Sequence, residues 1–183
     1  MPRTLAVLIL MLAALTLSPA SGAANANPPP HCDARAVRAL GPVEPRAQQT
    51  LVVESFGACA DPLLVIWIDR PPGRVQHLHF ARLAAYAPGA RTRRAAAQAV
   101  ADIMARIEPR PASAIEAWTK LHAEDDAPGG ASWAGTRLAK PDHDRIRSSA
   151  KHILLIPTDT TRGKLTAWDD ANEEWVDMVY YGD

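Results

Sequence analysis

The alternation of hydrophobic and polar positions predicts strands near both ends of the chain, with helices between them. Leu51–Gly57 opens the strand pattern, and Leu63–Asp69 (LLVIWID) is continuously apolar and β-branched. Such a run is typical of a central strand covered on both faces. The Arg70–Gly73 sequence (RPPG) predicts a turn, so Arg74–Ala81 returns as the second arm of a hairpin. Val75–Tyr86 also fits a helical period, which leaves a helix as the alternative for this segment.

The middle of the chain carries the helical patterns. Thr92–Ile107 is rich in alanine and places three apolar residues on one side, namely Ala99, Ile103 and Ile107. Ser113 and Glu116 form a capping box, which predicts a second helix whose apolar side carries Ile115, Trp118 and either Leu121 or His122. The polar stretch Glu124–Lys140 that follows is expected to be a loop.

Strand patterns return in the last third of the chain. Ile153–Ile156 reads as a buried strand, and Lys164–Trp168 with Glu174–Tyr181 reads as a hairpin. A four-residue loop, Asp170–Glu173, would let the apolar residues of both arms share one face. That register sets Ala167 opposite Val176 and Leu165 opposite Met178.

The same register assigns the aromatic residues of the hairpin to its other face. Trp168 lies opposite Trp175, and Asp177 and Tyr181 lie further along that face. If a second layer covers the face, the tryptophans belong to the core. If the face is open, these four residues form an aromatic surface of the kind that binds proteins or glycans.

The first 26 residues are typical of a secretory signal peptide. Arg3 gives a positive start, Leu5–Leu17 is apolar, and Ala24–Ala26 offers a processing site. We expect residues 27–49 to form a Pro-rich arm with a short helix at Ala34–Leu40. Residues 50–183 then form a single α+β domain: a mostly antiparallel sheet with two helices inserted between the N-terminal and C-terminal strands.

The composition and the cysteine content limit the class of partner and the cellular compartment that we expect. The chain has 20 Lys and Arg against 20 Asp and Glu, so the basic footprint of a nucleic-acid binder is missing. Removing the signal peptide takes away one arginine, which leaves 19 against 20. The only cysteines, Cys32 and Cys59, are expected to pair as a structural disulfide in an oxidising compartment. We expect the periplasm, or secretion as the alternative, with no membrane anchor.

Two groups of residues suggest chemistry. His77 and His79 would project from the same face of a regular strand about 7 Å apart, as two metal ligands do. Asp142, His143 and Asp144 would supply a third ligand or an acid/base pair. A surface role for the histidines and a polar turn at Pro141–Arg145 are the alternatives. No cofactor is expected.

The chain contains neither a G-x-S-x-G nor an H-E-x-x-H motif, so no coherent catalytic set emerges. We therefore expect a small exported binding protein, with an envelope protein as partner in an inhibitor or immunity-type role, or a cell-wall glycan. A small hydrolase or metal-dependent enzyme using the His/Asp residues is one alternative. A structural envelope protein without a ligand is the other. Convergence of those residues in one pocket would favour the enzyme, and an exposed apolar patch would favour the binder.

Overall fold

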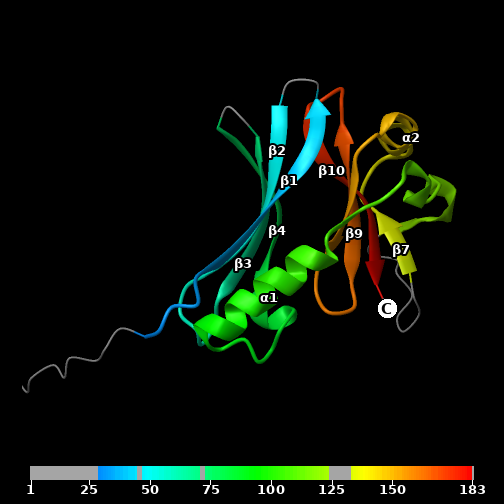
Figure 1. The fold of residues 1–183 in the computed structure, drawn as a ribbon. Helices are drawn as coiled ribbons and strands as arrows, with labels where there is room; N and C mark the ends of the chain where they lie inside the picture. Colours follow the sequence, from blue (N-terminus) through cyan, green and yellow to red (C-terminus); the bar gives the residue numbers. More distant parts are fainter. Residues whose placement is uncertain (1–28, 45–46, 71–72, 124–132, 183) are drawn as a thin grey trace, which may run out of the picture.

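A computed structural model describes residues 29–44, 47–70, 73–123 and 133–182. The predicted signal peptide, 1–26, lies outside these residues. The α+β class is confirmed, but the strands form two sheets where one was expected (Figure 1). No helix within the described ranges is long and apolar enough to span a membrane.

The first sheet, sheet 1, is antiparallel with the strand order β1-β2-β3-β4. Its strands are β1 (Ala34–Glu44), β2 (Ala47–Phe56), β3 (Leu63–Arg70) and β4 (Arg74–Arg82). The hairpin around the RPPG sequence is therefore confirmed. The short helix predicted at Ala34–Leu40 is wrong: each residue there pairs with β2, so sheet pairing overrides the helix propensity of its alanines.

The second sheet, sheet 2, has the order β5-β8-β9-β10-β7-β6 and is antiparallel except between β6 and β7. Its longer strands are β8 (Ile153–Pro157), β9 (Gly163–Asp169) and β10 (Glu174–Gly182). Its shorter strands are β5 (Glu108–Pro109), β6 (His122–Ala123) and β7 (Trp133–Thr136). The strand and the hairpin predicted in this region are confirmed.

One of the two predicted helices is correct. Helix α1 (Arg93–Arg106) begins after the N-cap Thr92, whose hydroxyl accepts a hydrogen bond from the Ala95 amide. The helix predicted from Ser113 is wrong, because only the single 3-10 turns η2 (Ala112–Ala114) and η3 (Trp118–Lys120) form there. The second helix is instead α2 (Lys140–Ser149), which starts with proline in its first turn.

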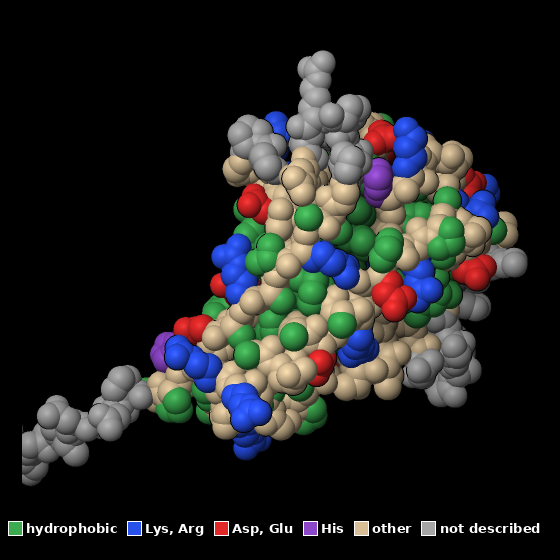
Figure 2. Space-filling model, in the orientation of Figure 1, with side chains coloured by type: hydrophobic (Ala, Val, Ile, Leu, Met, Phe, Trp, Pro, Cys, Tyr) green, Lys and Arg blue, Asp and Glu red, His purple; other side chains and the backbone are tan. Residues whose placement is uncertain are grey.

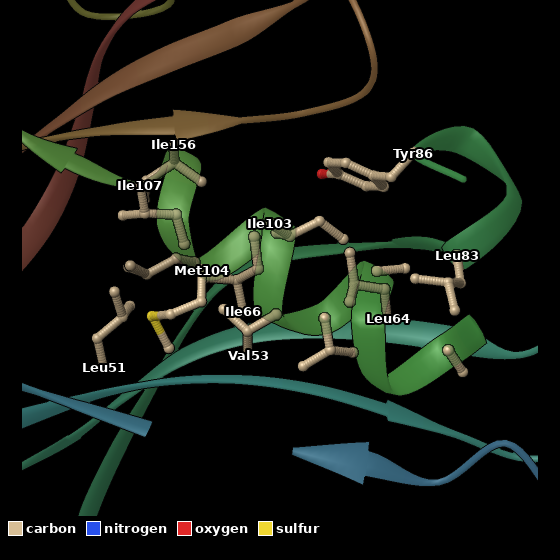
Figure 3. Close-up of a cluster of buried hydrophobic side chains, with 14 of the residues drawn as sticks. Leu51, Val53, Leu64, Ile66, Leu83, Tyr86, Ile103, Met104, Ile107 and Ile156 are labelled. Atoms are coloured by element: carbon tan, nitrogen blue, oxygen red, sulfur yellow. The ribbon is translucent and has the colours of Figure 1, made fainter. Parts of the chain in front are cut away.

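The main core lies between the two sheets and includes α1. It takes alternate residues of β2 and β3, the apolar side of α1, and residues from the facing side of sheet 2. Figure 3 shows side chains of β2, β3 and α1 pointing toward one another, with Ile156 of sheet 2 beside them. A further 3-10 turn, η1 (Leu83–Ala85), closes the far end of this core. A smaller core, centred on Ile146, Leu165 and Val179, lies on the opposite face of sheet 2 beneath α2.

Cys32 and Cys59 form the predicted disulfide. Both are buried in the main core, and the Cys32 and Cys59 amides donate to the Gly57 and Pro30 carbonyls. The bridge therefore fastens the start of β1 to the turn after β2. A disulfide of this kind points to a compartment outside the cytoplasm.

The C-terminal hairpin has the predicted register near its turn and departs from it at Met178. Trp168 pairs with Trp175 and Ala167 with Val176, as expected. Leu165 lies opposite Val179 because Met178 is an extra residue in β10. This β-bulge shifts every later residue of β10 by one position, and the change matters for the polar side chains described below.

Candidate functional site

The two histidines of β4 lie on opposite faces of sheet 1. His77 pairs with Trp67 and is exposed, whereas His79 pairs with the buried Ile66. The cause is a second β-bulge at Leu78, which breaks the alternation that a regular strand would have. The expectation that both histidines share a face is therefore wrong. No group of three or more metal-ligating side chains occurs among the described residues.

The acidic cluster lies on α2, away from both histidines. Arg145 of α2 contacts Asp169 at the end of β9, with Nη1 to Oδ1 at 2.7 Å. His79 lies beside Lys164 near the start of β9, five positions or about 16 Å away along the strand. Asp142 is exposed, so the expected third ligand does not reach the histidines.

His143 is fully buried under α2, and neither ring nitrogen has a hydrogen-bond partner in the described part of the chain. Its Nδ1 is 3.6 Å from Asp144 Oδ1, too far for a good hydrogen bond. Burial lowers the pKa of His143, and Asp144 opposes the shift. Lys140, bonded to Asp144, lowers the pKa of that carboxyl. An acid/base pair open to substrate is thus not formed.

Trp168 and Trp175 belong to the main core, at 2% and 5% exposure. The rings meet edge to face with centroids 5.9 Å apart, and Trp175 Nε1 donates to Gln49 Oε1 at 2.8 Å. Sheet 1 covers this face of the hairpin. The open-face alternative is wrong, and the alternative that assigned both rings to the core is the one found.

Asp177 is the centre of a polar network on the same face. Its carboxylate accepts from Lys164 Nζ at 2.6 Å, from Thr166 Oγ1 at 2.8 Å and from Tyr180 OH at 2.9 Å. In a regular strand Asp177 and Tyr180 would point to opposite faces. The bulge at Met178 brings them together, because Met178 and Val179 both turn to the smaller core.

Lys164 is the residue that the sequence analysis missed. It is 4% exposed, and its Nζ also donates to the Leu78 carbonyl of β4 at 2.5 Å. A lysine inside an otherwise apolar strand was the available signal, since lysine is almost never fully buried without a partner. Its pairing across two sheets could not be read from the sequence.

A cavity of about 410 Å³ opens along the free edge of β4, and we call it the edge cavity. Its lining comes from β4, the start of β9, the end of β10 and the segments beside them. The lining residues are His77, Leu78, His79, Phe80, Arg137, Thr158, Arg162, Gly163, Lys164, Asp177, Tyr180 and Tyr181. The edge cavity thus combines His77, His79, Asp177 and Tyr181, which the sequence analysis had assigned to two different hypotheses.

Burial and the positive charge of Lys164 lower the pKa of His79. A hydrogen bond with the Thr158 backbone and the negative charges of Asp177 and Asp159 oppose this shift. The ring therefore stays neutral at neutral pH, and its Nε2 is buried without a partner among the described residues.

A second cavity, of about 450 Å³, lies on the other side of the β8–β9 turn between Arg106, Arg110 and Leu155. It shares Arg162 and Tyr181 with the edge cavity.

The outward side of sheet 1, which we call the outer face, carries apolar side chains that belong to neither core. Cross-strand pairing identifies its members: Val37, Val52, Trp67 and His77 form one row, and Arg35, Glu54, Val65 and Phe80 form the next. Its apolar residues are Val37, Ala39, Val52, Phe56, Leu63, Val65, Trp67, Val75 and Phe80. None of them belongs to either core cluster.

This face holds most of the exposed large apolar side chains in the described ranges. The members concerned are Val37 (57% exposed), Phe56 (40%), Leu63 (39%), Val75 (51%) and Phe80 (62%). Among the other side chains whose burial the structure describes, only Trp118 is a large apolar one of similar exposure, at 36%. An open antiparallel sheet face is usually polar, so an apolar one marks an interaction site.

Charge on the outer face is balanced. Arg35 lies over the Trp67 ring at 5.4 Å, and Arg82 pairs with Asp61 at 2.5 Å. Glu54 and Asp69 supply the negative charges of the face. On the side of the molecule where α1 lies, Figure 2 likewise shows basic and acidic side chains interspersed. The outer face therefore suits a partner that is bound through apolar contact.

Comparisons with known proteins give no relative: no protein family, no characterised protein and no solved structure matches this chain.

Proposed function

We propose that this chain is an exported binding protein whose outer face contacts a protein partner in the cell envelope. One observation carries the proposal: β3 has the continuous apolar pattern of a strand covered on both faces, yet on its outer side only Val65 is buried, whereas Leu63 is exposed and Trp67 is half-buried. The missing cover would come from another molecule.

The chemistry of the face favours a protein over a glycan. Aliphatic side chains, among them Val37, Leu63 and Val75, outnumber the aromatic ones, whereas glycan sites depend on aromatic platforms with many hydrogen-bond donors. Interfaces between proteins have apolar, aromatic centres with charged residues at the rim. An inhibitor or immunity-type role suits a small, disulfide-bridged domain with one such face. The disulfide supports an oxidising compartment, for which we propose the periplasm.

Site-specific photo-crosslinking in the native cell envelope tests the proposal. Benzoyl-phenylalanine is placed at position 80 or 37 on the outer face, and at position 98 on the exposed side of α1 as the matched control. A discrete adduct from positions 80 and 37, but not from position 98, supports a partner on this face. Adducts of equal yield from all three positions, or none from the outer face, would contradict it.

A further inference from the structure

We propose that the edge cavity binds a small molecule that carries one carboxylate group on a ring-shaped body. The edge cavity shares His77 and Phe80 with the outer face, but its centre is the charged network of Lys164 and Asp177 and not an apolar surface. The proposal therefore does not depend on the partner.

Lys164 is the first anchor for the carboxylate. Its ammonium has three protons, and the described residues provide two acceptors, Leu78 O and Asp177 Oδ2. The third proton is available to an acceptor that enters the edge cavity. A charge-assisted bond to a carboxylate oxygen would be about twice as strong as a neutral one.

Arg162 is the second anchor. It lies two positions before Lys164, so their Cα atoms are about 7 Å apart along the strand direction, and both line the edge cavity. Its guanidinium forms an ion pair with Asp159, whose Oδ2 is 3.8 Å from Nε, and makes no closer hydrogen bond within the described ranges. A ligand carboxylate could accept from Lys164 with one oxygen and from Arg162 with the other.

Asp177 holds the Lys164 ammonium in place at the edge cavity. Its oxygens accept from Lys164, Thr166 and Tyr180, so most of its acceptor positions are already occupied. A buried ion pair adds little net stability compared with apolar residues of similar size. Two bulges, at Leu78 and Met178, nevertheless aim the side chains of facing strands at this point, as bulges beside binding sites do.

The walls fit a ring. Phe80 and Tyr180 are aromatic residues of the lining, and the cavity volume of about 410 Å³ lies in the range of small-molecule sites. A flat body such as a benzene ring could pack against these side chains while its carboxylate faces Lys164. Benzoate is the simplest probe with both features.

Titration of the ¹⁵N-labelled protein with benzoate, followed by NMR, tests the proposal, with benzamide as the uncharged control of the same shape. We expect a Kd in the millimolar range for benzoate, at least tenfold weaker binding of benzamide, and shifts centred on Lys164, Arg162 and Tyr180. Binding of both probes within threefold of each other, shifts elsewhere, or no binding at 50 mM would overturn the site.

Variants separate the site from nonspecific charge. Arg162→Gln, at an exposed position, should weaken benzoate at least fivefold, whereas Arg94→Gln on α1 should leave it unchanged. Lys164→Met combined with Asp177→Asn removes both charges; the asparagine oxygen accepts from one of the two hydroxyls and its amide donates to the other, so the fold is expected to survive. Benzoate shifts that persist in this folded double variant would overturn the proposal, and their loss would support it.

Discussion

Both faces of sheet 1 carry large apolar side chains, but the surroundings of these side chains differ. The inner face packs Leu51, Ile66 and Ile68 against α1 and sheet 2, and all three are fully buried. The outer face places Val37, Val75 and Phe80 in solvent. Hydrophobic pattern alone therefore shows that a face needs a cover, and the covering layer need not belong to the same chain. Substitutions on the inner face should therefore destabilise the fold, whereas substitutions on the outer face should weaken partner binding.

Removing the disulfide should have the largest effect, because the bridge holds β1 and β2 beside the inner core. The Cys32→Ala, Cys59→Ala double variant loses a 27-residue cross-link, which is worth about 3–4 kcal/mol of unfolding free energy. Urea denaturation with and without reductant measures the loss in the natural chain. A reduced protein as stable as the oxidised one would show that the inner core needs no such restraint.

Ile66→Ala tests the inner face directly. The side chain is fully buried between β3, α1 and sheet 2, so its truncation leaves a cavity and should cost about 3 kcal/mol of unfolding free energy. Chemical denaturation measures the change. A loss below 1 kcal/mol would mean that the inner face packs loosely and that the contrast between the faces is false.

His79, on the inner face, is expected to make the free energy of unfolding depend on pH. Its pKa is lowered in the folded protein, while in the unfolded chain it takes up a proton near its ordinary value of about 6.5. Stability from this group is complete above pH 6.5 and decreases as the pH falls below it, by up to about 1.4 kcal/mol per pH unit.

His79→Leu should therefore flatten part of the acid limb of stability against pH, with the remainder belonging to His143, whose pKa is also lowered. His77→Gln, on the exposed side of the same strand, is the control and should retain the acid limb. Thermal unfolding between pH 4.5 and 8 gives both slopes. Equal slopes in the wild type and His79→Leu would show that folding does not lower the pKa of His79.

Phe80→Ala should have the smallest effect on folding. The ring is 62% exposed and its ring contact is with His77 at 4.9 Å, so we expect a change within about 0.5 kcal/mol. Denaturation beside Ile66→Ala compares the two faces in one experiment. A loss of 2 kcal/mol or more would assign Phe80 to the fold and remove it from the proposed interface.

The sequence predicts elements well where the pattern is long and local. LLVIWID gives β3, the Ala-rich stretch capped by Thr92 gives α1, and the four-residue loop after Asp169 gives the hairpin register near its turn. Helix α2 escapes prediction because only His143 and Ile146 are buried along it, which is too few for an apolar stripe.

The candidate sites depend on features that periodicity cannot reveal. The bulges at Leu78 and Met178 each reverse the side to which later residues point, so His77 separates from His79 and Asp177 meets Tyr180. Whether a continuous apolar strand is covered on one side or two is decided by where other elements pack. The outer face can therefore be identified only from the structure, which shows that α1 packs on the inner side of sheet 1.

The central claim is that the outer face is kept apolar for a partner. The most direct measurement is the adduct yield of benzoyl-phenylalanine at position 37 in the native envelope, with and without the polar pair Val75→Thr and Phe80→Ser, which lie on the same face. We predict at least a tenfold loss of adduct while the thermal midpoint stays within about 3 °C, since exposed substitutions affect folding little. An unchanged adduct yield in a folded variant, or an unfolded variant that shows these side chains to be needed for the fold, would contradict the claim.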